Sequence, residues 1–120
     1  MHANFSTSSM RAEATGQATI DSAIKNLEKK HSTHIENFGA GLSERLTGEH
    51  ETCHISEFRS GLSDRGASIR IPPSVAEKGY GYIEDRRPAA NADPYVVSRL
   101  LIETVCEIST KKPVKLKQAV

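Results

Sequence analysis

The sequence has little apolar bulk. Its 120 residues include no tryptophan, aromatic residues make up 5%, and Val, Ile, Leu and Phe together number 25. A share of 25 in 120 lies close to the level below which chains tend to be disordered. The net charge of only +1, however, removes the self-repulsion that usually accompanies disorder. We therefore expect one small folded unit that is short of the large side chains needed to fill a core of its own.

Other absences exclude whole classes of protein. No apolar run approaches the roughly 18 residues that a membrane-spanning helix needs, and the polar first ten residues contain no apolar signal core. Two cysteines, Cys53 and Cys106, are too few for a disulfide framework. The balanced charge argues against a broad basic surface for nucleic acid. We therefore expect a cytoplasmic protein whose partners include neither a membrane nor a nucleic acid.

Two segments have the apolar spacing of amphipathic helices. From Ile20 to Asn37, apolar side chains recur every three or four residues, and two glycines follow. A second helix is expected over 94–109, because Asp93 is a good N-cap and Pro94 suits the first helical position. His31 and His34 lie near the end of the first helix, where the helix dipole favours them, and we interpret them as structural.

Two further segments alternate in the manner of strands, and both lie between the predicted helices. Residues 66–72 read G-A-S-I-R-I-P, and residues 79–87 read G-Y-G-Y-I-E-D-R-R. Alternation in the second strand separates two sets of side chains: Tyr80, Tyr82, Glu84 and Arg86 on one face, and Gly81, Ile83, Asp85 and Arg87 on the other. The short connection lets the two strands pair as a hairpin. The expected fold is therefore α+β, with antiparallel strands and flanking helices.

Arginine is concentrated in the middle of the chain. Six of the eight arginines lie between residues 45 and 87, where there is one lysine. The guanidinium group pairs with carboxylate and phosphate through two parallel hydrogen bonds, whereas lysine offers a point charge. This distribution indicates oxyanion binding. The alternative is that these arginines are ordinary surface residues or ion-pair partners.

One short pattern matches a zinc protease. Residues 50–54, His50-Glu51-Thr52-Cys53-His54, satisfy H-E-x-x-H, in which both histidines must lie on one face of a helix. Thr52 and Cys53 favour a helix only weakly, and no third ligand with a matching helix pattern follows. We interpret this match as coincidence and keep a zinc metalloprotease as a remote alternative.

Four motifs, taken in order, resemble those of the eukaryotic-type (class II) glutamine synthetases. Residues 1–10 read M-H-A-N-F-S-T-S-S-M, and residues 45–52 read R-L-T-G-E-H-E-T. Residues 64–72 read D-R-G-A-S-I-R-I-P, and residues 82–94 read Y-I-E-D-R-R-P-A-A-N-A-D-P. The resemblance extends to about Ile108. It implies that residues 1–109 are the C-terminal portion of a glutamine synthetase catalytic domain, and that residues 110–120 form a basic tail.

The resemblance implies an activity: ligation of ammonia to L-glutamate, driven by ATP through a γ-glutamyl phosphate, with Mg²⁺ or Mn²⁺. It implies that His2 and Glu84 bind the metal and that Arg45, Arg65 and Arg86 hold glutamate. It also implies that Glu51 and Arg86 act in catalysis. The ATP contacts that it implies are Asn4, Phe5, Ser6, Arg65, Arg70, Tyr82, Ile83 and Glu84. Glu51 is expected on a mobile loop, where it shields the phosphorylated intermediate from water and takes a proton from ammonium.

The resemblance also implies that parts of the family's site are missing from this chain. The family has an N-terminal β-grasp domain, further metal-binding glutamates upstream, and active sites between the subunits of homo-oligomeric rings. We therefore expect the chain to be a fragment or truncated form that is inactive alone. The alternative is a non-catalytic binding or assembly protein derived from a glutamine synthetase.

Overall fold

The computed structural model describes residues 2–48, 54–62 and 66–108. These segments contain short strands and six helices, four of which follow the first strand in succession. Their order is β1 (Ala3–Phe5), α1 (Ser8–Arg11), α2 (Gly16–Lys29), α3 (His31–Asn37), α4 (Leu42–Arg45), β2 (Ser60–Leu62), β3 (Ile69–Ile71), α5 (Pro73–Lys78), β4 (Ile83–Asp85) and α6 (Pro94–Val105). The predicted basic tail, residues 110–120, lies outside the described residues and stays a prediction.

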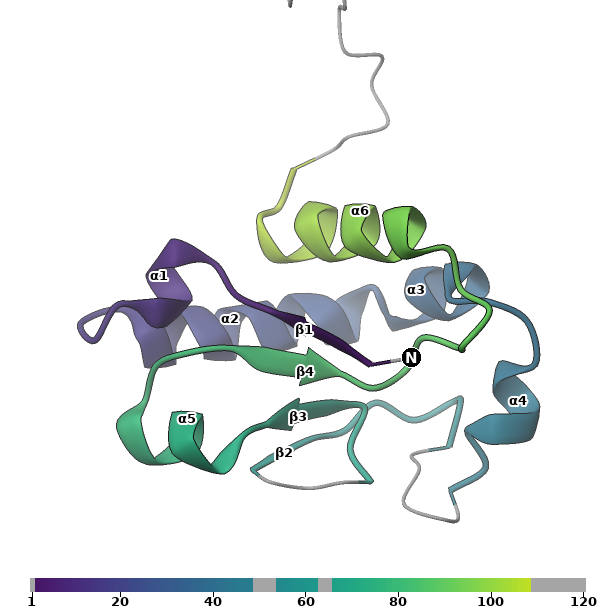
Figure 1. Cartoon of the computed structure of the whole chain (residues 1–120), viewed down its shortest axis with the longest axis horizontal. Helices are drawn as coiled ribbons and strands as arrows, with labels where there is room; N and C mark the ends of the chain where they lie inside the picture. The colour runs from purple at the N-terminus through teal and green to yellow at the C-terminus, as the bar shows by residue number, and fades with distance from the viewer. Residues whose placement is uncertain (1, 49–53, 63–65, 109–120) are drawn as a thin grey trace, which may run out of the picture.

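The four strands form one mixed sheet in the order β1-β4-β3-β2 (Figure 1). Strand β4 pairs antiparallel with β1 and with β3, and β2 runs parallel to β3. Helices α2 and α3 lie behind the sheet in Figure 1, and α6 runs along the side of β1 and contacts both helices. This arrangement confirms the predicted α+β class with flanking helices.

The predicted hairpin is confirmed as the pair β3–β4, although each strand is shorter than its sequence pattern. The register places Ile69 opposite Asp85 and Arg70 opposite Glu84. The connection is helix α5, which begins at Pro73, where the missing N–H of proline costs nothing. It ends at Lys78 and is capped by Gly79, whose left-handed backbone (φ 82°) suits a residue without a Cβ.

The alternation predicted for the strands decides which side chains enter the core. Ile69 and Ile83 are fully buried on the helix side of the sheet, in a cluster with Leu27 of α2 and Phe38, which follows α3. Asp85 and Arg87 are buried on that side too. No described helix lies over the opposite face, the open face, in the view of Figure 1.

The single helix predicted over residues 20–37 is wrong in one respect. The chain leaves helical geometry at Lys30 (φ −104°, ψ 13°), which divides the segment into α2 and α3. Ser32 and Thr33 follow the break, and both residue types favour a helix only weakly. On α3, after the break, Nδ1 of His34 accepts a hydrogen bond from the buried Arg87 behind the sheet.

Helix α6 begins as the sequence predicts. The Asp93 side chain accepts a hydrogen bond from the backbone N–H of Tyr95 at 2.9 Å, and Pro94 occupies the first turn. Buried Val97, Leu100 and Leu101 pack this helix into the core. The helix ends at Val105, four residues before the predicted end at 109.

Removing the cap of α6 tests this anchoring. Asp93→Ala is expected to lower the free energy of unfolding by about 1 kcal/mol, because the N–H of Tyr95 loses its acceptor. Urea unfolding followed by circular dichroism measures the change. Asp93→Asn is the matched control, since its side-chain oxygen restores the cap; an equal loss in both variants would contradict the capping role.

No helix in the described segments is both long enough and apolar enough to cross a membrane.

Candidate active site on the open face of the sheet

Strand register brings most of the predicted site residues to one face of the sheet. Asn4 lies opposite Glu84 in the pair β1–β4, and Arg70 lies opposite Glu84 in the pair β3–β4. Side chains two residues apart share a strand face, so the alternation continues to the neighbours of Asn4 and Glu84. The set gathered on the open face is His2, Asn4, Ser6, Arg70, Tyr82, Glu84 and Arg86.

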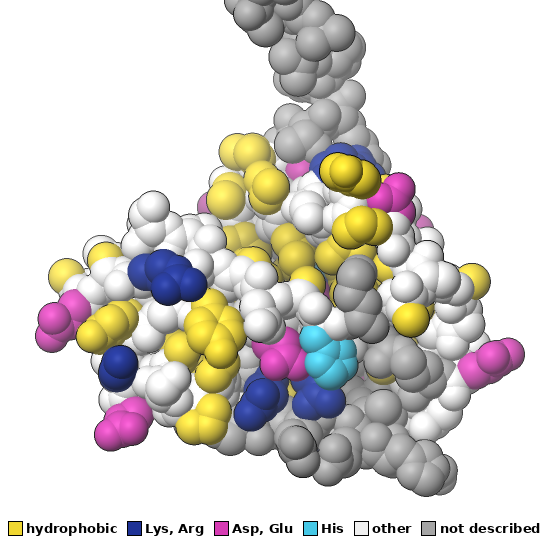
Figure 2. Space-filling view, viewed as in Figure 1, with side chains coloured by type: hydrophobic (Ala, Val, Ile, Leu, Met, Phe, Trp, Pro, Cys, Tyr) yellow, Lys and Arg dark blue, Asp and Glu magenta, His cyan; other side chains and the backbone are white. Residues whose placement is uncertain are grey.

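Glu84 is the centre of this set. Its Oε1 lies 2.9 Å from Nδ1 of His2 and 3.6 Å from Nε of Arg86. Its Oε2 accepts a hydrogen bond from Nη1 of Arg70 at 3.4 Å. Figure 2 shows acidic, histidine and cationic side chains gathered near the middle of this face. One carboxylate therefore stands among three groups that are, or can become, cationic.

One buried donor of this cluster favours an added anion. The Nε of Arg70 is buried without a hydrogen-bond partner among the described residues. A buried donor without an acceptor is costly, and guanidinium matches phosphate and carboxylate oxygens well. The cluster can therefore accept an oxyanion beside Glu84.

A hollow of about 370 Å³ lies next to the cluster. Asn4, Phe5, Ser6, Arg11 and Tyr82 line it. The Nε of Arg11 donates a hydrogen bond to Oγ of Ser6 at 2.6 Å. The hollow thus combines an aromatic ring, amide and hydroxyl groups, and a cation, which is a suitable lining for part of a nucleotide.

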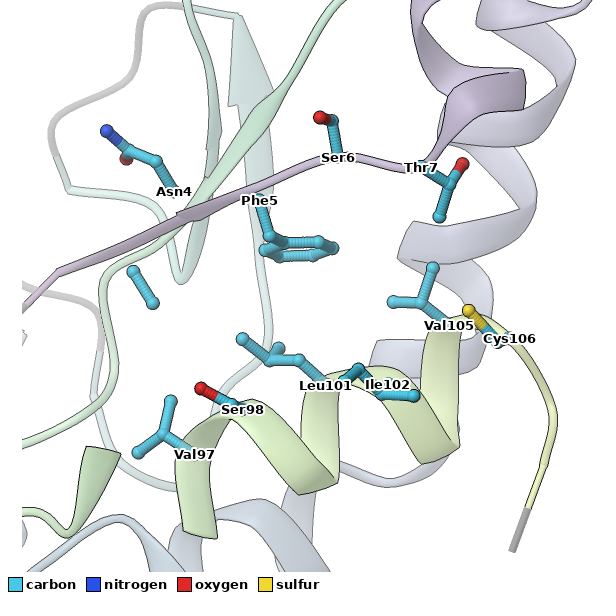
Figure 3. A pocket seen from close by; sticks show the side chains of 11 residues that line it. Asn4, Phe5, Ser6, Thr7, Val97, Ser98, Leu101, Ile102, Val105 and Cys106 are labelled. Atoms are coloured by element: carbon cyan, nitrogen blue, oxygen red, sulfur yellow. The ribbon is translucent and has the colours of Figure 1, made fainter. Parts of the chain in front are cut away.

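The ring of Phe5 points to the other side of β1. In Figure 3 it faces α6, whereas the side chains of Asn4 and Ser6 leave the strand on the opposite side. A second hollow, of about 290 Å³ and mainly apolar, lies between β1 and α6, with Phe5, Leu101 and Val105 in its wall. The predicted ATP contacts therefore divide: Asn4, Ser6 and Tyr82 share the open face, and Phe5 lies mostly toward α6.

Ile83 is the other predicted ATP contact that faces away from the cluster. Its side chain is fully buried on the helix side of the sheet. This buried side chain is not available to a nucleotide on the open face. The prediction for Ile83 is therefore narrowed to a main-chain contact.

Three predicted residues cannot be added to this geometry. Glu51 and Arg65 lie outside the described residues. Arg45 is the last residue of α4, and its side chain is likewise not described. Their roles stay predictions.

The zinc-protease pattern gains no support from its described residue. His54 lies outside any helix, and its Nδ1 accepts a hydrogen bond from the backbone N–H of Ser56 at 3.2 Å. Residues 50–53 lie outside the described residues. A zinc site of this type needs both histidines on one helix, so His54 does not meet the requirement.

Behind the sheet, a buried network holds the strand that carries Glu84 and Arg86. The guanidinium of Arg87 donates to both carboxylate oxygens of Asp85, from Nε at 2.9 Å and from Nη2 at 2.7 Å. It also donates to Nδ1 of His31 at 2.8 Å and to Nδ1 of His34 at 2.9 Å. The rings of Phe38 and Phe58 lie 5.2 and 5.5 Å from its central carbon. Four of the five N–H donors of this buried cation are therefore directed at these acceptors.

Burial changes the protonation of both histidines. Desolvation, and then the positive charge of Arg87, lowers the pKa of His34 to about 4. Desolvation and Arg87 also lower the pKa of His31, although a hydrogen bond to the backbone of Ile55 opposes them. The structural role predicted for the two histidines stands, but its physical basis is this contact with Arg87 rather than the helix dipole.

Sequence reasoning missed two contributors to the site. Arg11 lines the nucleotide-sized hollow, and its position just after the predicted N-F-S-T segment was the available signal. The Asp85–Arg87 pair was placed correctly on the far face, but its role was not recognised. No periodicity indicates that a buried charge pair will meet two histidines more than fifty positions earlier.

The donor set at Glu84 is suited to a divalent cation. Carboxylate oxygen is a preferred ligand of Mg²⁺ and Mn²⁺, whereas imidazole nitrogen is a more usual ligand of the later first-row metals. Within the described segments, no group of three or more His, Cys, Asp or Glu side chains could hold a metal by itself. His2 and Glu84 therefore fit a cation whose other ligands are water, phosphate oxygens or carboxylates from elsewhere.

Comparison with known proteins gives a consistent result. The chain is 58% identical over 104 residues to the chloroplastic glutamine synthetase of Chlamydomonas reinhardtii, a match that covers 87% of this chain and 27% of the relative. It is 55% identical over 105 residues to the glutamine synthetase of Kluyveromyces lactis and 52% identical over 105 residues to that of Saccharomyces cerevisiae; each match covers 88% of this chain and 28% of the relative. No family model matches. The chain is therefore homologous to the glutamine synthetases and spans a little over a quarter of the length of these relatives.

Proposed function

We propose that this chain supplies part of an active site that joins ammonia to L-glutamate at the expense of ATP. The reaction proceeds through a γ-glutamyl phosphate and yields L-glutamine. The carrying observation is the cluster of His2, Arg70, Glu84 and Arg86 on one sheet face, beside a hollow lined by Asn4, Ser6 and Tyr82. Homology to glutamine synthetases supports the reaction class.

The proposed division of labour follows the position of each side chain. Asn4, Ser6 and Tyr82 contact the nucleotide in the hollow, with Arg11 as a further cation there. Arg70, whose Nε has no hydrogen-bond partner among the described residues, faces the phosphates. Arg86 holds the carboxylate of glutamate and then the charge that develops during phosphoryl transfer. Arg45 and Arg65 add further contacts to glutamate, and Glu51 closes over the intermediate.

His2 and Glu84 would hold the divalent cation. When bound, this ion neutralises phosphate charge and so assists phosphoryl transfer. Glu84 also keeps the guanidinium groups of Arg70 and Arg86 close together, because its two carboxylate oxygens face one of them each. The carboxylate thus organises the cationic side of the site as well as the metal side.

The chain alone is expected to lack catalytic activity. Among the described residues, His2 and Glu84 are the candidate metal ligands of the proposed site, and the match spans about 28% of the yeast relatives. The proposal therefore includes further carboxylates from outside these residues and assembly into homo-oligomeric rings. A cytoplasmic location stays a prediction.

A chimera tests this proposal. The 104 matching residues of the Chlamydomonas enzyme would be replaced by those of this chain, and ATP-dependent glutamine formation would be assayed. We expect the chimera to be active and the isolated 120-residue chain to be inactive.

The parent enzyme and a chimera carrying Glu77→Gln, on the exposed surface of α5, serve as controls. A chimera that assembles like the parent but makes no glutamine would contradict the proposal and favour a non-catalytic binding or assembly role. Glutamine formation by the isolated chain would contradict the expectation that it is incomplete.

A further inference from the structure

The contact of Arg87 with two histidines fixes their tautomers. A guanidinium group has only donors, so the Nδ1 atoms of His31 and His34 must be unprotonated acceptors. The proton of each neutral ring then lies on Nε2. It is donated by His31 to the carbonyl of Ile55 at 2.9 Å and by His34 to Oγ1 of Thr104 at 2.7 Å. Both rings are fully used only while they are neutral.

Protonation of either histidine would break this arrangement. The added proton would lie on Nδ1, directly opposite an N–H of Arg87, so that two donors and two positive charges face each other. The other charged groups around His34 are Asp85, Glu103 of α6 and the second histidine. Asp85 is already occupied by the fork of Arg87, and the net effect of burial and charge still opposes a proton on either ring.

The network connects elements that are distant in sequence. His31 and His34 lie on α3, and Thr104 lies on α6. Asp85 ends β4, and Arg87 follows two residues later. Side chains of Glu84 and Arg86 leave the same stretch of chain on its open face, so a shift of Asp85 or Arg87 moves them as well.

We propose that His31 and His34, together with Arg87, form a proton-sensitive lock that fastens β4 to α3 and α6. As neutral acceptors the two rings hold the guanidinium group against Asp85. Uptake of a solvent proton at Nδ1 releases Arg87 and loosens β4. The two histidines are thus positioning residues for Glu84 and Arg86. Only this last consequence rests on the proposed function; the lock itself does not.

The sign of the pH dependence follows from the lowered pKa values. The unfolded chain takes up a proton at each histidine near pH 6.5, whereas folded His34 does so only near pH 4. The folded state therefore binds fewer protons between these values. The full stabilisation is present above about pH 6.5 and is lost progressively as the pH falls toward 4.

Nitrogen-15 NMR of the histidines tests the lock in the unmodified chain. We expect both His31 and His34 to show the neutral tautomer with the proton on Nε2, and neither to titrate near 6.5 while the chain is folded. Exposed His54 serves as the internal reference. Normal titration of His34 in the folded chain, or a proton on its Nδ1 at neutral pH, would overturn the proposal.

Two substitutions of His34 separate its two hydrogen bonds. In His34→Asn the side-chain oxygen can replace Nδ1 as the acceptor for Arg87, whereas in His34→Gln the amide can replace Nε2 as the donor to Thr104. From about pH 7.5 to about pH 5, the unfolding equilibrium constant of the wild-type chain should rise roughly 25-fold through His34 alone. His34→Asn should lose most of this rise, and the control His54→Asn should keep it.

Each outcome of the unfolding series bears on the lock. His34→Gln should be less stable than His34→Asn at neutral pH, because it removes the acceptor that His34 offers to Nη2 of Arg87. A full pH dependence in His34→Asn, or equal stability of the two variants, would contradict the lock. If neither variant folds, the NMR titration of the wild-type chain decides. These measurements do not require activity, so a failed lock and a failed proposed function are distinguishable.

Discussion

Arg87→Met is expected to lower the free energy of unfolding by about 3–5 kcal/mol. The guanidinium group is 2% exposed and donates to both oxygens of Asp85. Methionine fills much of the same volume but supplies no donor and no charge. Asp85, which is fully buried, would then carry a charge without its partner. His31 and His34 would each lose the donor at Nδ1 as well.

Urea unfolding at neutral pH measures this loss, and two further variants identify its cause. Arg87→Lys keeps the charge but lacks the planar fork, so it should restore only part of the stability. Arg87→Met combined with Asp85→Leu removes the unpaired carboxylate and should be less destabilised than the single variant. A double variant as unstable as the sum of its parts would contradict the pairing.

Arg99→Met is the matched control for loss of an arginine. Arg99 pairs with Glu103 across one helical turn at 3.5 Å, and its side chain is 33% exposed. Exposed pairs of this kind contribute little, so the change should stay within about 0.5 kcal/mol. A similar loss at Arg99 and Arg87 would show that burial of the guanidinium group is not the cause.

The elements with local signals could be predicted from the sequence. Alternation over residues 79–87 identified which side chains of β4 enter the core, and Asp93-Pro94 identified the start of α6. The hairpin followed because β3 and β4 are close in sequence. These features depend on neighbouring residues, and the sequence contains that information directly.

The elements that depend on distant pairing could not be predicted in this way. Strand β1 has three residues, and it pairs with β4 about eighty positions later. The parallel pairing of β2 with β3 has no local signature either. The break at Lys30 could not be predicted either, because the apolar spacing continues across it. The contact that follows the break, between His34 and Arg87, joins residues that are distant in sequence.

The candidate site shows the same division. Periodicity alone placed Tyr82, Glu84 and Arg86 on one face, and the structure agrees. The addition of His2 and Asn4 to that face required the resemblance, because nothing near them in sequence indicates a partner. The sparse apolar content of the sequence agrees with a core that is not completely filled. An apolar hollow remains between β1 and α6, and Ile102 of α6 is 48% exposed.

Glu84→Gln is expected to reduce kcat/KM for glutamine formation by the chimera at least 100-fold, a loss comparable to removal of one charge-stabilising group from an active site. Glutamine has the same shape, so the sheet should fold as before. Its neutral amide is a poorer ligand for a divalent cation, and it no longer opposes the charges of Arg70 and Arg86. The two guanidinium groups should then separate.

Three measurements on Glu84→Gln distinguish a metal and charge role from a purely structural one. The Mn²⁺ concentration needed for half-maximal activity should rise about tenfold or more, while the urea midpoint changes little. Glu77→Gln, at an exposed position on α5, should leave kcat/KM, the Mn²⁺ requirement and the urea midpoint unchanged. Unchanged kcat/KM in Glu84→Gln would refute the assignment. A drop in kcat/KM that only parallels a loss of folded protein would show that Glu84 has a structural role. Its three close contacts would then stabilise the sheet and would not act on the substrate.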